Sequence, residues 1–198
     1  MKAYINPANL LTSGNLAAGF VALVLAARGE LVWAAGLVGA AAVFDALDGL
    51  VARHARCEGT FGSQLDSLAD LASFGLAPAL ILYAGGLASV PVAGIGACLA
   101  FVLCGAWRLA RFSLVESRYS FVGLPIPPAG LVGALLGAAP TPAPIVCAIV
   151  VVGAVLMAST LPFPTFAGIA RGLRRPRPRE VHLPAPPERR EHAARPSR

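Results

Sequence analysis

Long apolar runs, separated by short polar connections, make up most of this 198-residue chain. A helix needs about 20 apolar residues to cross a bilayer, and it satisfies its backbone hydrogen bonds internally. The runs therefore predict an all-α fold, a polytopic membrane helical bundle of about six transmembrane helices. The expected spans are residues 9–27, 31–53, 63–83, 91–113, 127–139 and 145–159.

The position of the first run would also suit a secretory signal peptide. Thr12, Ser13 and Asn15 interrupt it where a signal peptide has an unbroken apolar core, and further apolar runs follow. We therefore expect this segment to be a span of the bundle.

Composition supports the same class. Hydrophobic residues are 57% of the chain and charged residues 13%, which excludes an ordinary soluble domain. The four cysteines show no C-x-x-C spacing, which argues for packing roles and against a redox or zinc site.

The basic residues are distributed unevenly between the two sides of the predicted bundle. Six spans place both termini on one side, and of the 16 basic residues only Arg28 falls on the other side. Basic residues concentrate on the cytoplasmic side of membrane proteins. Both termini and the connection after the second span are therefore expected to face the cytoplasm, in a multi-pass protein of the plasma membrane.

Residues 171–198 are rich in Pro and Arg and poor in apolar residues, which is typical of disorder. We expect a transmembrane domain over residues 1–170 and a disordered, basic cytoplasmic tail over 171–198. Anionic headgroups of the lipid bilayer would attract the tail, by about 1 kcal/mol per basic residue near the surface. No nucleic-acid partner is expected, because no aromatic residue interleaves with the arginines.

The four aspartates of the chain all lie between the second and third spans or at their edges. Asp45 and Asp48 are three residues apart, and Asp66 and Asp70 are four apart, so on helices each pair shares one face. Ionisable groups at membrane depth are costly and indicate function. Clustered carboxylates supply the hard oxygen ligands that Mg²⁺ and Mn²⁺ prefer, so the stretch predicts a metal site.

The acidic stretch reads Asp-x2-Asp-Gly-x2-Ala-Arg-x8-Gly-x3-Asp-x3-Asp. This pattern resembles the signature of the CDP-alcohol phosphotransferase family at every fixed position. The shorter stretches 9–16, 65–75, 108–112, 123–127 and 161–164 are similar to the branch of that family that makes phosphatidylserine. The matching residues of the signature are Asp45, Asp48, Gly49, Ala52, Arg53, Gly62, Asp66 and Asp70.

The resemblance implies an enzyme that transfers the phosphatidyl group of CDP-diacylglycerol to the hydroxyl of L-serine and releases CMP. It implies that Asp45, Asp48 and Asp66 hold Mg²⁺ or Mn²⁺, and that Asp70 both contacts the metal and acts as general base. It also implies a homodimer. The residues expected to contact CDP-diacylglycerol are Asn9, Thr12, Gly49, Ala52, Arg53, Thr60 and Gly62.

Two groups of polar residues have a second interpretation. Asn9, Thr12 and Asn15 could serve only helix capping and interhelical hydrogen bonds. Arg108 and Arg111, three apart on one helical face, are the candidates for binding the acceptor's carboxylate, but they could instead be cytoplasmic anchors.

Two other functions are compatible with parts of the pattern. A family member with glycerol 3-phosphate or an inositol phosphate as acceptor would need further basic residues, for which Arg56, Arg108 and Arg111 are available. A divalent-cation transporter would also place carboxylates in the membrane. It would not require Gly49 and Gly62 at fixed spacing, nor confine its carboxylates to one end of the bundle.

Overall fold

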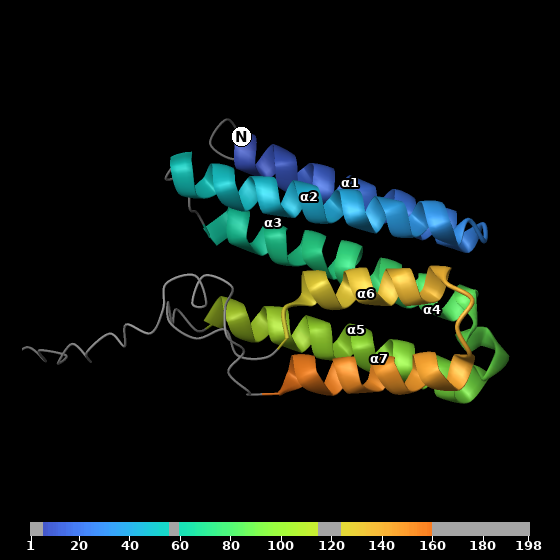
Figure 1. Ribbon diagram of the computed structural model, residues 1–198. Coiled ribbons are helices and arrows are strands. Elements are labelled where there is room, and N and C mark those ends of the chain that lie inside the picture. The colour runs from blue at the N-terminus through green and yellow to red at the C-terminus, as the bar shows by residue number, and fades with distance from the viewer. Residues whose placement is uncertain (1–5, 56–59, 115–123, 160–198) are drawn as a thin grey trace, which may run out of the picture. The chain divides into compact units, whose positions relative to one another are not determined.

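A computed structural model describes residues 6–55, 60–114 and 124–159, with backbone only for 52–55 and 112–114. All of these residues belong to one compact unit, Met1–Pro164. The described chain is helical, as predicted, and its helices run roughly parallel or antiparallel to one another (Figure 1). The elements are α1 (Pro7–Ala27), α2 (Leu31–Ala55), α3 (Thr60–Asp70), the π-helix η2 (Leu71–Leu76), α4 (Ala77–Gly85), the 3₁₀-helix η3 (Leu87–Ser89), α5 (Pro91–Leu114), α6 (Ile126–Ala138) and α7 (Ala143–Ala158).

Helices α1 and α2 form an antiparallel hairpin and pack along their length. The Asn6 side chain caps α1 by accepting a hydrogen bond from the Asn9 amide at 2.8 Å, and Pro7 occupies the first turn, where no amide is needed. Gly29 has a φ of 80°, which a residue without Cβ adopts at little cost, and it allows the chain to reverse into α2.

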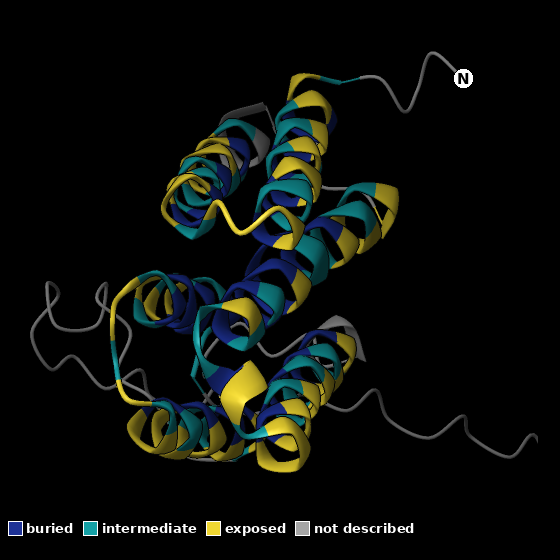
Figure 2. Cartoon of the chain, turned by 90° about the vertical axis from the view of Figure 1, so that its right-hand side faces the viewer, coloured by how far each residue is buried: buried dark blue, intermediate teal, exposed yellow. Residues whose placement is uncertain are grey.

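The run from α3 through η2 to α4 is the central helix of the unit. More than half (56%) of its most apolar stretch is buried, compared with 22–33% for the other three long helices. Buried residues accordingly follow this helix in Figure 2. The π turn begins immediately after Asp70, and such turns are frequent at functional sites.

Six helical segments lie at the predicted positions, but they are not equally long. Four are long and apolar enough to cross a membrane: Pro7–Ala27, Leu31–Val51, Thr60–Gly85 and Pro91–Arg111. The remaining two, α6 and α7, have 13 and 16 residues, which correspond to about 20 and 24 Å. Prolines in the connection between them, Pro140 and Pro142, end the first and begin the second. The expectation of about six transmembrane helices is therefore met by four long apolar helices and two short ones, at segments that were also expected to be short.

Helix α6 packs closely onto η2 and α4 through glycines. A Cβ on Gly130 would lie 2.7 Å from the Phe74 Cα, and one on Gly137 would lie 2.7 Å from the Leu82 amide nitrogen. Phe74 and Leu82 are fully buried by this contact. The small residues of α6 thus serve helix contacts within the protomer.

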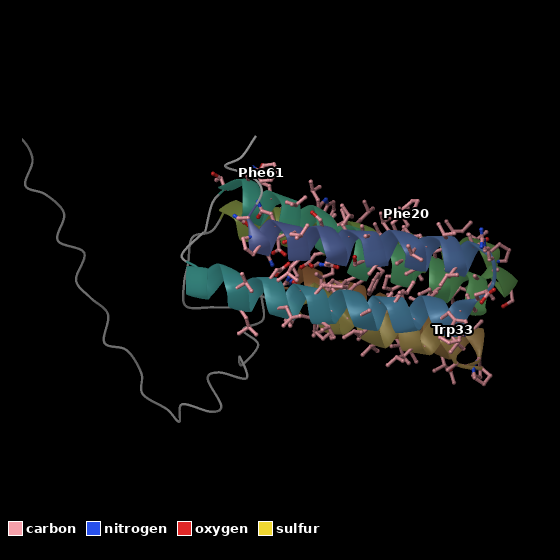
Figure 3. All side chains as sticks on the ribbon, turned by 90° about the horizontal axis from the view of Figure 1, so that it is seen from above. Phe20, Trp33 and Phe61 are labelled. Atoms are coloured by element: carbon pink, nitrogen blue, oxygen red, sulfur yellow. The ribbon has the colours of Figure 1, made fainter. Side chains whose placement is uncertain are left out.

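Large apolar side chains cover the outside of the bundle. Phe20, Trp33 and Phe61 point away from the helices that carry them (Figure 3), and 63%, 71% and 48% of their surfaces are exposed. In water such a surface would cause association, whereas lipid tails solvate it. Together with the four long apolar helices, it identifies an integral membrane protein.

Some predictions lie outside the described residues. These are the whole tail, 171–198, with the domain boundary at residue 170, the side chains of Ala52 and Arg53, and the whole of Arg56.

Candidate active site

Three aspartates from two helices meet near the end of the bundle where α1 begins. One carboxylate oxygen from each of Asp45, Asp48 and Asp66 lies within 4.8 Å of the other two. Asp45 and Asp48 are almost one turn apart on α2, and Asp66 faces them from α3. The spacing in the sequence predicted a shared face for Asp45 and Asp48, and the fold adds the third carboxylate to it.

The donor set of this cluster is suited to a hard divalent cation. It consists of carboxylate oxygens, and three like charges this close repel one another unless a cation neutralises them. Asp66 Oδ1 is buried and has no hydrogen-bond partner among the described residues. A buried oxygen of this kind normally has a partner, and a bound ion would supply one.

Helix α1 supplies a hydroxyl to the cluster. Thr12 Oγ1 lies 2.9 Å from Asp48 Oδ2 and 3.0 Å from the Ala8 carbonyl oxygen, and Thr12 is buried. Its single proton can be donated to either oxygen. Thr12 therefore contacts an aspartate of the cluster, which bears out the interhelical hydrogen bond considered for it and places it at the site.

Asp70 lies one turn beyond Asp66 on α3 and is not one of the three clustered carboxylates. It is buried, and the Asn15 amide donates a hydrogen bond to its Oδ1 at 3.2 Å. Its carboxylate is close enough to interact electrostatically with the other three aspartates and with Arg108. Asp70 thus interacts with the acidic cluster and with the buried guanidinium of Arg108.

The residues expected to contact the nucleotide are spread around the cluster. Asn9 is buried on α1, next to Gly62 of α3, where a Cβ would lie 3.0 Å from Asn9 Oδ1. Gly49 is half-buried on α2, and Thr60 is exposed at the first position of α3. Asn9 and Gly62 are therefore neighbours on the first turns of α1 and α3, and Thr60 begins the second of these helices.

The two candidate acceptor residues have different surroundings. Arg108 on α5 is 8% exposed, and its Nε is buried with no hydrogen-bond partner among the described residues. Arg111 is half-buried, and its Nη2 donates to the Ser159 carbonyl oxygen at 3.4 Å. Arg108 therefore interacts with Asp70, whereas Arg111 contacts the end of α7.

Sequence reasoning assigned no place in the site to Asn15 or Ser73. Asn15 is fully buried and bonded to Asp70, and Ser73 Oγ donates to the Asn15 carbonyl oxygen at 3.0 Å. The available signal was the spacing of polar residues in an otherwise apolar run. Asn9, Thr12 and Asn15 are each three residues apart and so lie on one side of α1.

Comparison with known proteins points to one family. The family model for CDP-alcohol phosphatidyltransferases matches residues 5–173. A CDP-diacylglycerol–serine O-phosphatidyltransferase of Bacillus subtilis is 34% identical over 159 residues, which are 79% of this chain and 89% of that protein.

Proteins of the same name from two other organisms are similar over shorter stretches. The Helicobacter pylori protein is 39% identical over 131 residues, which are 65% of this chain. The Methanocaldococcus jannaschii protein is 35% identical over 131 residues, or 66% of this chain. The matched stretch spans 55% of the Helicobacter relative and 60% of the Methanocaldococcus relative. With its four-aspartate signature and the match over most of its length, the chain belongs to the CDP-alcohol phosphatidyltransferase family.

Proposed function

We propose that this protein transfers the phosphatidyl group of CDP-diacylglycerol to the hydroxyl of L-serine, giving phosphatidylserine and CMP. The observation that carries the proposal is the carboxylate cluster of Asp45, Asp48 and Asp66, with Asp70 beside it. The names of the relatives from three organisms support serine as the acceptor.

The clustered aspartates are the proposed ligands of Mg²⁺ or Mn²⁺, with Asp70 contributing an oxygen from the edge. Bound there, the cation would neutralise the pyrophosphate of the substrate. The orphaned Asp66 Oδ1 supports this assignment. Thr12 holds Asp48 Oδ2 by a hydrogen bond and so fixes the orientation of one ligand.

Asp70 is the proposed general base. The serine hydroxyl oxygen forms a bond to the phosphorus that bears diacylglycerol, the bond from that phosphorus to the CMP oxygen breaks, and CMP leaves. Asp70 takes the proton of the serine hydroxyl, so charge and atoms balance. Asp70 is buried and lies at the edge of the cluster. This position supports the role, because the base must reach the acceptor hydroxyl and not only the pyrophosphate that the metal binds.

The first turns of α1 and α3 are the proposed nucleotide site. Asn9 and Thr12 offer polar side chains there, and Gly49 and Gly62 have no Cβ that would hold a phosphate or ribose away from the helix backbones. Ala52, Arg53 and Thr60 are also proposed to contact the nucleotide, because they lie in or next to the signature in the sequence. Arg53 would donate two parallel hydrogen bonds to a phosphate.

Arg108 is the residue we assign to the carboxylate of serine. It is buried, it interacts with Asp70, and its Nε is available for a bidentate contact. An acceptor with its own phosphate, such as glycerol 3-phosphate or an inositol phosphate, would call for a second cation. Arg111 is the nearest candidate in sequence, and its Nη2 donates to the Ser159 carbonyl oxygen at 3.4 Å.

The setting of the enzyme is proposed from charge and composition. The protein would lie in the plasma membrane as a homodimer, with the site, both termini and the basic tail at the cytoplasmic face. The transmembrane domain would extend over residues 1–170, and the tail from 171 would remain disordered against anionic lipid.

The test is CMP release by the purified protein, given CDP-diacylglycerol and one alcohol at a time. Serine should support release and incorporation into phosphatidylserine, while glycerol 3-phosphate and inositol phosphates should not. The matched control is Asp66→Asn, which keeps the size of the side chain and should be inactive. Release that depends on glycerol 3-phosphate instead of serine would overturn the assignment of the acceptor.

A further inference from the structure

Asn15 makes two hydrogen bonds that join α1 to the helix carrying Asp70. Its amide nitrogen donates to Asp70 Oδ1 at 3.2 Å, and its backbone carbonyl accepts from Ser73 Oγ at 3.0 Å. Asp70 and Ser73 are three residues apart, so both bonds come from the same side of the central helix. All three residues are buried, and Asn15 and Ser73 are fully so.

The chain is shaped to allow this contact. Gly19, one turn after Asn15 on α1, packs directly on Ser73, and a Cβ on Gly19 would lie 2.8 Å from the Ser73 Cα. No side chain larger than glycine fits there without moving the two helices apart. Ser73 itself lies in the π turn that begins just after Asp70.

We propose that Asn15 is the positioning residue of this site: its amide orients the Asp70 carboxylate, and the Ser73 bond to its carbonyl fixes α1 against the Asp70 turn. The Asn15 amide then holds Oδ1, and Oδ2 is the oxygen that we assign to the proton of the acceptor hydroxyl. The inference rests on the proposed function, since it assigns Asp70 a proton to accept.

Two polar side chains of α1 donate hydrogen bonds to two different aspartates. Thr12 serves Asp48 in the metal cluster, and Asn15, three residues later, serves Asp70. Loss of the Thr12 donor should therefore weaken binding of the nucleotide with its ion. Loss of the Asn15 donor should slow the chemical step while binding is retained.

The experiment measures kcat, the KM for CDP-diacylglycerol and CDP affinity in Mn²⁺, the last by calorimetry. Asn15→Leu has a similar volume but no donor, and we expect kcat to fall roughly 10- to 100-fold with CDP affinity within about twofold of wild type. Thr12→Val should instead weaken CDP affinity and leave kcat less affected. Ser13→Ala is the matched control, because Ser13 is exposed and, among the residues that the structure describes, its hydroxyl bonds only to the Asn9 carbonyl of its own helix, at 2.8 Å.

A double-mutant cycle distinguishes positioning from packing. If Asn15 acts through Asp70, Asn15→Leu should have little further effect on kcat in an Asp70→Asn background. Equal fold-losses in the two backgrounds would overturn the proposal, as would wild-type kcat in Asn15→Leu. If Asn15→Leu does not fold, Ser73→Ala removes the second bond without adding volume, and it should lower kcat in the same direction by a smaller factor.

The two proposals fail in different ways. A wild-type protein that releases no CMP with any alcohol contradicts the proposed function. An active wild type whose kcat is unaffected by both Asn15→Leu and Ser73→Ala contradicts the inference alone.

Discussion

Helices α1 and α3 differ from α6 and α7 in what they bury. The first two bury Asn9, Thr12, Asn15 and Asp70, whereas the buried residues of α6 and α7 are apolar or glycine. Both pairs lie in one compact unit, and each must pack against its neighbours.

The difference shows that a buried helix face can serve either ligand binding or close helix packing. Burying polar groups costs free energy unless they are paired, so the α1–α3 contact is retained for what it can bind. The α6 face contributes close fit alone, through glycines against η2 and α4. Changes in the first region should therefore alter chemistry with little effect on folding, and changes in the second should do the opposite.

Metal removal should have the largest effect. If the cluster holds a divalent cation, exhaustive dialysis against EDTA should abolish CMP release, and added Mg²⁺ or Mn²⁺ should restore it. Full activity in excess EDTA would contradict the assignment of a metal site to the polar α1–α3 region.

Substitution of single aspartates should sharpen the contrast within the polar region. Asp70→Asn keeps the shape but cannot accept a proton, so kcat should fall by roughly 10²- to 10⁴-fold while CDP still binds. Asp45→Asn should instead weaken CDP binding, because it removes a ligand from the cluster. Equal loss of CDP binding in both variants would mean that Asp70 is chiefly a metal ligand.

A pair of glycine substitutions tests the apolar region. A Cβ on Gly137 would lie 2.7 Å from the Leu82 nitrogen, whereas one on Gly153 of α7 meets nothing within 4 Å. Gly137→Ala should lower stability by about 1 to 3 kcal/mol, the usual effect of overpacking, and Gly153→Ala should not. Thermal unfolding in detergent measures this, and kcat below the midpoint should stay within about twofold of wild type for both. Equal midpoints would show that the α6 contact is looser than described.

Removal of the tail should have the smallest effect. A chain ended after Arg171 should keep most of its turnover in detergent, because the composition of the tail cannot form a core. The proposed attraction of the tail to anionic lipid does not affect this assay, because the assay is carried out in detergent. A loss of turnover with an unchanged thermal midpoint would place part of the site beyond residue 171.

The sequence predicted the helices better than their contacts. The six expected segments agree with the observed ones to within three residues at each end, because apolar runs and prolines mark helix boundaries directly. The short segments expected at 127–139 and 145–159 correspond to α6 and α7, which have 13 and 16 residues.

Within the site, local spacing was informative and long-range pairing was not. The shared face of Asp45 and Asp48 followed from a three-residue spacing. The bond from Asn15 to Asp70 joins residues 55 positions apart. It depends on the rotation of two helices about their axes, which the π turn and the Gly19–Ser73 contact set through packing. No periodicity in the sequence encodes that rotation.

The central claim is that the α1–α3 region binds the nucleotide through a divalent cation held by the aspartates. The most direct test is a calorimetric titration of CDP into the purified protein at increasing Mn²⁺, with Asp66→Asn beside it. Ser67→Ala is the control, since within the described part of the chain its hydroxyl bonds only to the Ser63 carbonyl of the same helix, at 3.0 Å. We predict saturable CDP binding that requires Mn²⁺ in wild type and Ser67→Ala and is lost in Asp66→Asn. Equal CDP affinity in EDTA and in Mn²⁺, or in Asp66→Asn and wild type, would contradict the account.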